Sequence, residues 1–570
     1  MRFSRKLCVL SLAMICVSAM IGWTVYQSQP APVRPLDQLV PEGALLYIEA
    51  KNFSGLLKDW STSPEKAQWL KSDDYRVFSN SRLFLRLGKA SDEFAVAAGV
   101  PPSMQFLNDA AGKESALAIY NIGSLEFLYV THLASGKFLE SALWQSRNKF
   151  QPRTSAGKPF FTRKDEESGR VVAFAVVDDY LVLGTREDLV ASALELLAGG
   201  KSRPLQQEGW YRQAAAAAPG APGDLRMVLN LEKIAVTPHF RTYWVQQNIT
   251  EMQSYASAVC DLHREGAVYR EERVILPKKT VEDENALLAT EQAISGLLTM
   301  VPKESGFYRA APVTSKEALA TVVQKVLVPH FGAAADEKLA PQVQLTEGQT
   351  GSGSDLETRI DVEPVVSRTG NGNATQALEK HFAAANLQAM LVVHGSRKNK
   401  DGVLLNIASV VAISSPSGWD LAAVQKGIQD AVAPGLTAAR LGTEWREVKD
   451  AGGYYELDGL SPVLLAQRGT VLLFANDPAL LSSVLQANGT APAQPVSYAA
   501  GFSHSRERKS FYQLTSLIDH GAVATERQPQ FFSQNIASFS RALGRVDSEE
   551  IVIRQSKDKI LQTVTYHWAQ

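Results

Sequence analysis

Cysteine is scarce in this chain of 570 residues, which contains three. Cys8 and Cys16 lie in an apolar N-terminal run, which leaves Cys260 as the single cysteine of the body. An internal disulfide of the body is therefore excluded, and its domains must be stabilised by apolar burial, as domains of this size commonly are. We expect Cys260 to be a small buried side chain and not a reactive thiol, because free cysteine is among the most buried residue types.

An excess of charge of either sign is also missing. The chain has 58 Lys and Arg against 59 Asp and Glu, so it lacks the basic excess that is typical of nucleic-acid-binding proteins. Hydrophobic residues make up 45% and charged residues 21%, as in globular proteins, which excludes global disorder. We therefore expect several folded domains and no nucleic-acid partner.

The common signatures of catalysis, cofactor binding and metal binding are missing as well. The nine histidines form no H-x-x-x-H pair, and no G-x-S-x-G elbow occurs. The sequence Gly199-Gly200-Lys201-Ser202 resembles the end of a phosphate loop, but Glu195 stands where the leading glycine is needed. Because it follows a helical pattern, we interpret it as the end of a helix. The sequence thus predicts no catalytic, cofactor-binding or metal-binding residue and favours a non-enzymatic protein.

One long hydrophobic run is present, at residues 7–26, and it contains no charged residue. About 20 apolar residues suffice for a helix to cross a bilayer, and the basic residues in positions 1–6 place the N-terminus in the cytoplasm. The sequence predicts a cytoplasmic N-terminus (1–6), a single-pass inner-membrane anchor (7–26) and a proline-containing spacer (27–38). The bulk of the chain is then periplasmic or otherwise extracytoplasmic. A cleaved signal peptide is the alternative, and it places the body on the same side.

The remaining chain is predicted to be a tandem repeat of two α+β units, at residues 39–280 and 300–570, joined by a helix at 281–299. Both units open with Val-Pro and an apolar strand, at Val40-Pro41 and Val301-Pro302. Both then show the same order of strand pairs and helices, which favours antiparallel or mixed sheets with packed helices. Two unrelated α+β domains with similar local patterns remain the alternative.

The clearest match between the two units is a hairpin followed by a helix. In the first unit the hairpin turns at Asp178-Asp179 and Thr185 is predicted to cap the helix. In the second unit the turn is predicted at Arg468-Gly469, and Asp477 followed by proline is predicted to begin the helix.

One polar and aromatic cluster, at residues 239–248, is a possible recognition surface. It contains Arg241, Tyr243 and Trp244, and these residue types are enriched in binding sites. The alternative is a helix that buries its aromatic face in the core and pairs Arg241 with an acid.

The opening at residues 40–50, VPEGALLYIEA, and the later segment at 174–197, FAVVDDYLVLGTREDLVASALELL, resemble a bacterial family of exported or membrane-anchored proteins of unknown function. In that family a Val-Pro strand opening follows an N-terminal membrane segment. The resemblance implies the same organisation here, but it implies no functional residue, because none is assigned to the family.

These observations favour a membrane-anchored extracytoplasmic protein that acts as a non-enzymatic envelope binding or scaffold module, with the membrane and an unidentified envelope protein or ligand as partners. Two other hypotheses stay open. A carrier of lipid or another apolar ligand would need an elongated apolar cavity. An envelope hydrolase with a dispersed active site would need a His or a carboxylate pair with a shifted pKa. The ligand, the oligomeric state and the cleavage of the N-terminal segment are not determined by the sequence.

Overall fold

The three-dimensional structure is a computed structural model. It describes residues 34–70, 75, 78–133, 135–238, 252–281, 283–316, 319, 320, 323, 380, 382, 385–398, 405–436, 444–449, 453–457, 462–507 and 545–569. None of the helices in these ranges is both long and apolar enough to cross a membrane. The anchor predicted at residues 7–26 lies outside the described residues and stays a prediction.

The chain divides by its internal contacts into two compact units. Unit 1 comprises residues 1–54 and 90–212, and unit 2 comprises residues 55–89 and 213–570. Three helices cross the division: α2 (Phe53–Thr62), α5 (Arg82–Ala98) and α10 (Gly209–Ala217). The division differs from the repeat boundaries predicted from the sequence, because strands before residue 280 pair with strands at the C-terminus, as described below.

Unit 1 contains an antiparallel sheet of strong apolar character. Its strands are β1 (Leu46–Ala50), β2 (Glu114–Asn121), β3 (Glu126–His132), β4 (Gln151–Ser155), β5 (Lys158–Lys164), β6 (Val171–Val177) and β7 (Tyr180–Gly184). They are hydrogen-bonded in the order β1–β2–β3–β7–β6–β5–β4. Every residue of β7 is buried, as expected for a strand covered on both faces.

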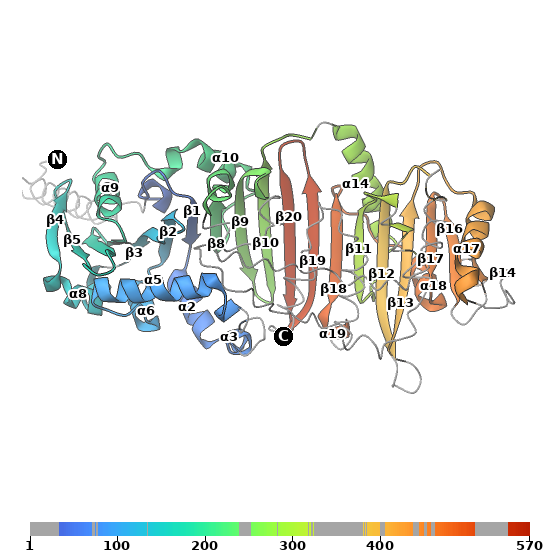
Figure 1. Cartoon of the computed structure of the whole chain (residues 1–570), viewed down its shortest axis with the longest axis horizontal. Helices are drawn as coiled ribbons and strands as arrows, with labels where there is room; N and C mark the ends of the chain where they lie inside the picture. Colours follow the sequence, from blue (N-terminus) through green and yellow to red (C-terminus); the bar gives the residue numbers. More distant parts are fainter. Residues whose placement is uncertain are drawn as a thin grey trace, which may run out of the picture. The chain divides into compact units, whose positions relative to one another are not determined.

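Helices cover both faces of the unit 1 sheet (Figure 1). On one face a single apolar cluster joins the sheet to α5, α6 (Met104–Ala110), α7 (Ser135–Leu139) and α8 (Ala142–Gln145). On the other face α9 (Glu187–Leu197) packs on β6 and β7 through Leu189, Val190, Ala193 and Leu194. The shorter elements of this unit are η1 (Leu36–Gln38), η2 (Arg147–Lys149), η3 (Leu205–Gln207) and the start of α10 (Gly209–Ala217).

Unit 2 contains a longer antiparallel sheet. Its strands are β8 (Leu225–Leu229), β9 (Tyr255–Glu265), β10 (Val268–Pro277), β11 (Phe307–Pro312), β12 (Ala389–Lys398), β13 (Leu405–Ser414), β14 (Trp445–Val448), β15 (Tyr454–Leu457), β16 (Val463–Arg468), β17 (Val471–Ala475), β18 (Tyr498–Ser503), β19 (Val546–Gln555) and β20 (Ile560–Trp568). Their order is β8–β9–β10–β20–β19–β18–β11–β12–β13–β17–β16–β15–β14. Strands β10 and β20, far apart in sequence, are neighbours in Figure 1.

Apolar clusters lie on both faces of the part of this sheet around β12, β13, β16 and β17. One cluster includes α14 (Glu284–Leu298) and α18 (Pro478–Gln486), and the opposite one includes α17 (Leu421–Leu436). Helix α14 lies inside residues 281–299, where the sequence predicts a helix. The other helices of the unit are α3 (Pro64–Trp69), α11 (Leu231–Ile234) and α19 (His504–Glu507). The expected α+β class with antiparallel sheets is confirmed for the described residues.

The strands fall into two series with the same pairing pattern. The order β1–β2–β3–β7–β6–β5–β4 is matched by β11–β12–β13–β17–β16–β15–β14. The order β8–β9–β10 is matched by β18–β19–β20. We call β1–β10 the first series and β11–β20 the second series. Residues at the same place in the two series can therefore be compared directly.

The predicted hairpin turns are tested by the backbone. Asp178 and Asp179 have φ values of 49° and 62°, as a two-residue type I′ turn requires, so this prediction is confirmed. In the second series Arg468 still pairs with Val471, so the turn lies at Gly469-Thr470, one residue later than predicted. Gly469 has φ of 60°, in the left-handed region that glycine adopts without strain.

The ends of two helices were also predicted. Asp477 accepts a hydrogen bond from the Leu480 N–H at 2.7 Å, which confirms it as the cap of α18. Gly199 has φ of 73° and the Gly200 N–H donates to the Glu195 carbonyl, so the glycines end α9 as interpreted. Thr185 as a helix cap is wrong: Arg186 precedes α9, and the Thr185 side chain binds another strand instead.

The close approach of Gly223 to β9 gives a first prediction. A Cβ at this position would lie 2.4 Å from the Leu262 carbonyl oxygen, a backbone atom that cannot rotate away. We expect Gly223→Ala to lower the free energy of unfolding by about 1–3 kcal/mol. Gly296→Ala is the control, because this helical glycine has open space around it and alanine should be neutral or stabilising by about 1 kcal/mol. Urea unfolding of both variants would measure the difference, and equal midpoints would contradict it.

Candidate functional site

The recognition surface predicted from the sequence, Arg241, Tyr243 and Trp244, lies outside the described residues, and its role stays a prediction. The described part of the chain contains no group of three His, Cys, Asp or Glu side chains that could hold a metal ion. Buried polar side chains are therefore the strongest guide to a site. They form one network in unit 1 and three pairs in unit 2.

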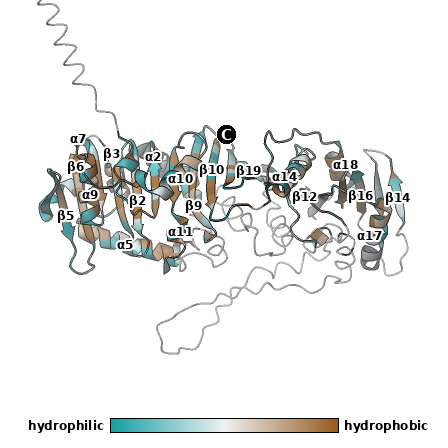
Figure 2. Ribbon diagram, turned by 90° about the horizontal axis from the view of Figure 1, so that it is seen from above, coloured by the Kyte–Doolittle hydropathy of each residue, from teal (hydrophilic) through white to brown (hydrophobic). Residues whose placement is uncertain are grey.

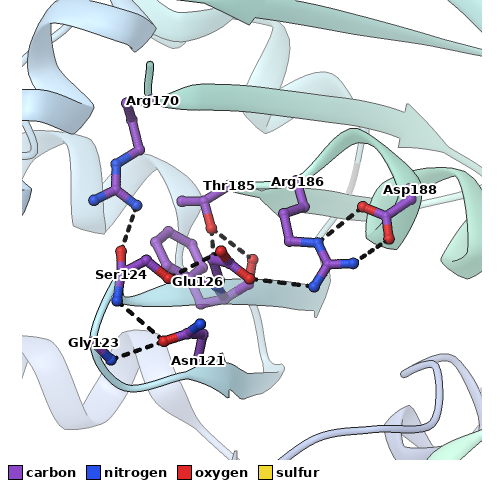
Figure 3. A network of polar contacts seen from close by, with 9 residues as sticks. Asn121, Gly123, Ser124, Glu126, Arg170, Thr185, Arg186 and Asp188 are labelled. Atoms are coloured by element: carbon purple, nitrogen blue, oxygen red, sulfur yellow. Dashed lines mark hydrogen bonds and ion pairs between the residues drawn. The ribbon is translucent and has the colours of Figure 1, made fainter. Parts of the chain in front are cut away.

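The network in unit 1 joins the β2–β3 turn to the start of α9 (Figure 3). Glu126 accepts from Ser124 at 2.9 Å and from Arg186 at 3.2 Å, and Arg186 also binds Asp188. Arg170 donates to the Ser124 carbonyl at 2.7 Å and pairs with Glu93 at 2.5 Å. Each carboxylate in this chain of contacts has a guanidinium or hydroxyl partner, so the network fixes the turn and leaves no group positioned for chemistry.

Thr185 holds the centre of this network. Its backbone N–H donates to the Phe127 carbonyl at 3.1 Å, and its hydroxyl accepts from the Phe127 N–H at 2.9 Å. In the second series Asn476 does the same with Ser409. Its N–H donates to the Ser409 carbonyl at 3.2 Å and its side-chain oxygen accepts from the Ser409 N–H at 2.7 Å. Two different residue types thus make one contact at corresponding places.

A row of side chains crosses unit 2 perpendicular to the strands. Each residue of the row is the direct cross-strand partner of the next, and the members, from β20 to β13, are Tyr566, Glu549, Phe502, Phe307, His394 and Ser409. The row contains both polar and aromatic side chains. Every member except Tyr566 is buried.

Glu549 of this row forms a buried polar pair with His504. His504 is the first residue of α19, and its Nε2 atom lies 3.2 Å from Oε1 of Glu549, with both side chains at most 3% exposed. The His504 ring packs edge-on against Phe502, at 4.7 Å between ring centres. Burial raises the pKa of the Glu549 carboxyl, and the hydrogen bond and charge of His504 act in the opposite direction.

The first series has apolar residues in the same places. Leu231 is the first residue of α11, as His504 is of α19, and both are buried. Leu229 pairs with Ala258, as Phe502 pairs with Glu549. The His504–Glu549 pair therefore replaces a leucine and an alanine, and the common fold does not require it.

His394 and Ser409 form a second buried polar pair in the row. The Nδ1 atom of His394 lies 2.6 Å from the Ser409 hydroxyl oxygen, and the imidazole stacks on Phe307 at 5.7 Å. Burial lowers the pKa of His394 to about 4, so the ring is neutral at pH 7. The corresponding cross-strand pair of the first series is Ile119 and Phe127, both without titratable groups.

A serine hydroxyl beside a neutral imidazole is the contact from which nucleophilic catalysis begins. Here the arrangement differs from an active site in two respects. Ser409 and His394 are 3% and 5% exposed, so a substrate has no direct access. The Ser409 N–H and carbonyl are both bound by Asn476, which leaves that amide unable to stabilise an oxyanion.

The first series has its own buried ion pair, at a different place. Arg226 and Asp261 are cross-strand partners in β8 and β9, and the guanidinium binds both carboxylate oxygens at 2.8 and 2.7 Å. Asp261 also accepts from the Gly223 N–H at 3.0 Å. Ala499 and Val552 occupy the corresponding cross-strand position in the second series. Each series thus buries a polar pair where the other has apolar residues.

Cys260 is the one free thiol among the described residues. It is half-buried in β9, and burial raises its pKa to about 11, with the charge of Glu271 acting in the same direction. The thiol is therefore protonated at pH 7 and a poor nucleophile, as expected from the sequence.

No member of the row belongs to a motif of the sequence. His504 and Glu549 are 45 residues apart and stand in no local motif. A comparison of the two series could have revealed these residues. At equivalent positions one series has a polar residue and the other has an apolar residue.

Comparison with known proteins adds little. No protein-family model and no curated protein matches the sequence. Among solved structures the chain is similar to crystal forms of TP0453. Form I is 11% identical and covers 44% of this chain and 82% of TP0453, with a TM-score of 0.25. Form III is 9% identical and covers 46% and 87%, with a TM-score of 0.23. Likeness at this level supports no inference about the present chain.

The His504–Glu549 pair gives a second prediction. We expect Glu549→Ala alone to lower the free energy of unfolding by about 1–3 kcal/mol, because the buried imidazole loses the carboxyl group beside it. The double variant His504→Leu/Glu549→Ala restores the residues of the first series and should recover most of this loss, since apolar replacement of a whole buried pair is often neutral. Urea unfolding of the single and double variants would measure it. A double variant no more stable than the single one would contradict the comparison of the series.

The low pKa of His394 gives a third prediction. The unfolded chain takes up a proton near pH 6.5, whereas the folded chain does so only near pH 4. Stability contributed by the neutral ring is therefore complete above pH 6.5 and is lost as the pH falls toward 4, by up to about 3 kcal/mol. Unfolding midpoints of the natural chain and of His394→Gln between pH 7 and 4 would test this. His567→Gln, at an exposed position of β20, is the control and should keep the natural pH dependence.

Proposed function

We propose that the protein is a membrane-anchored, extracytoplasmic scaffold or binding module of the cell envelope, built by tandem duplication of one α+β unit. The anchor is the segment at residues 7–26, and the duplicated body lies outside the cytoplasm.

The duplication is supported by contacts as well as by strand order. The strands of both series pair in the same order. In both series a side chain that follows the strand, Thr185 in one and Asn476 in the other, accepts a hydrogen bond from the backbone N–H of the equivalent residue on the neighbouring strand. Such agreement of topology and of individual hydrogen bonds is difficult to reach in two unrelated domains.

The observation that carries the scaffold proposal is the antiparallel pairing of β10 with β20. Eight residue pairs, from Val268–His567 to Ile275–Ile560, join the last hairpin of each series into one hydrogen-bonded sheet. This joint fixes parts of both series relative to each other. A continuous sheet with a fixed geometry suits a protein that presents a surface to a partner.

A hydrolase is the second candidate, because the His394–Ser409 contact is the one arrangement among the described residues with the partners of a nucleophilic dyad. Its burial and the engagement of the Ser409 amide favour the scaffold. An apolar-ligand carrier stays a prediction from the sequence.

The proposal is tested on the full chain in its own envelope. A photo-reactive amino acid at Glu550 of β19 or at His567 of β20, both exposed, should give a discrete cross-linked protein. The same amino acid at Lys557, in the exposed β19–β20 turn, is the control and should give no such product.

Native mass spectrometry of the same chain, extracted in detergent, distinguishes the alternatives. A retained lipid without a cross-linked protein would overturn the scaffold in favour of the carrier. Hydrolysis of an ester probe that is abolished by Ser409→Ala would overturn it in favour of the hydrolase.

A further inference from the structure

The strands on the two sides of the β10–β20 joint are arranged symmetrically. Their order is β8–β9–β10–β20–β19–β18, and Figure 1 shows them side by side. Read from either end, this order passes through the three strands that occupy the same places in the two series. All six strands belong to unit 2. Each series therefore presents its last strand to the last strand of the other.

The register of the joint is symmetric as well. Leu231 and His504 begin the equivalent helices α11 and α19, and the strand registers then make Ile275 of β10 equivalent to Tyr566 of β20. Counting back from this pair, Glu272 is equivalent to Thr563. Glu272 and Thr563 are also direct cross-strand partners in the joint. Equivalent residues that face each other mark a local twofold axis, as in the interface of a symmetric dimer.

A strand that lies against its own equivalent in this way has the register to pair with a second copy of itself. If β10 paired with β10 of a second copy about the same axis, Glu271 would face an arginine, Arg273 of that copy. Arg270 would face Val274, which is uncharged. Glu272 would face the Glu272 of the second copy, because it lies on the axis. Among the charged residues of β10, Glu272 alone would meet a like charge.

The surroundings of Glu272 make such a meeting unfavourable. Its side chain is 17% exposed, and its cross-strand partner in β9 is Asp261, which is 1% exposed. Pairing of two β10 strands would thus bring four carboxylates into one row, two from each copy. Like charges directly opposite on neighbouring strands destabilise their pairing, and partly buried charges are screened less by salt. The nearest basic groups reduce the repulsion: Arg270 Nε lies 3.4 Å from Glu272 Oε1, and His263 Nε2 lies 3.7 Å from Oε2.

The actual partner strand avoids this conflict. Residues 560–566 of β20 contain no charged side chain, whereas residues 270–273 of β10 are all charged. Figure 2 shows hydrophilic residues on β9 and β10. The row that begins with Asp261 and Glu272 continues through Thr563 to Val552 of β19, so it is acidic on one side of the joint and uncharged on the other.

We propose that β10 is a self-complementary strand edge whose alternative partner is β10 of a second copy of this chain, and that Glu272 excludes this partner in favour of β20. The covalent connection of the two series also favours β20, because it raises the effective concentration of that strand. The contribution of Glu272 is therefore seen when the connection is removed. The proposal goes beyond the scaffold function and uses only strand pairing in unit 2, so its failure would leave that function untouched.

Cleavage of the connection in the folded full chain tests the proposal. A protease site is inserted after Lys279, in the exposed segment between β10 and α14, and the purified chain is cut in detergent, so neither fragment has to fold alone. Native mass spectrometry then counts the fragment pairs after dilution and reconcentration. The natural sequence should give pairs of one N-terminal and one C-terminal fragment.

Glu272→Thr should raise the share of pairs made of two N-terminal fragments by about five-fold, because it removes the like-charge contact on the axis. Glu265→Thr is the matched control, since Glu265 is exposed at the end of β9 and lies off the axis, and it should leave the natural pairing unchanged. Pairs of two N-terminal fragments that are as frequent in the natural sequence as in Glu272→Thr would overturn the proposal.

The intact chain provides a second measurement, which does not depend on the behaviour of the fragments. Thr563→Glu places two glutamates opposite each other on the axis and should lower the urea midpoint of unfolding. The exchange variant Glu272→Thr/Thr563→Glu again pairs one glutamate with one threonine and should recover most of the loss. A Thr563→Glu chain as stable as the natural one would show that the axis tolerates two carboxylates, and this result would also overturn the proposal.

Discussion

The pairing of β10 with β20 is the interaction on which the architecture of unit 2 depends. It brings together two hairpins that are nearly 300 residues apart in the sequence and turns the end of the first series and the whole of the second into one sheet. It also explains why the compact units do not follow the repeat boundaries. Contacts that close over so long a loop carry a large entropic penalty in folding, so this joint is expected to form after the hairpins on either side of it.

The two series bury polar side-chain pairs at different positions. The first buries Arg226 with Asp261 on facing strands, and the second buries His504 with Glu549 and His394 with Ser409. Each of these positions is apolar in the other series, so the common fold tolerates either solution. A buried pair contributes little net stability compared with apolar residues, but it is specific, because either partner alone is strongly destabilising. The polar pairs therefore distinguish the two series at the level of packing while the strand order stays the same.

Local chemistry was sufficient to predict much of the fold. Two aspartates with left-handed backbone geometry form the turn at Asp178-Asp179, and Asp477 followed by proline begins α18, both as expected from short sequence patterns. A threonine before a helix resembles a cap, but the partner of the Thr185 hydroxyl is Phe127, 58 residues away in the sequence, so the local pattern predicts the wrong role. The row from Tyr566 to Ser409 could not be predicted for the same reason, since its members meet only when six strands are placed in register. The possible recognition surface at residues 239–248 lies outside the described residues and stays a prediction.

The repeated pairing pattern has a consequence for solubility. In a chain that ended after β10, this strand of ten residues would present an unpaired row of N–H and C=O groups, and β20 would do so in a chain that consisted of the second series alone. Exposed edges of this length favour intermolecular strand pairing and aggregation. In the intact chain the two edges cover each other, so each series protects the most vulnerable strand of its neighbour.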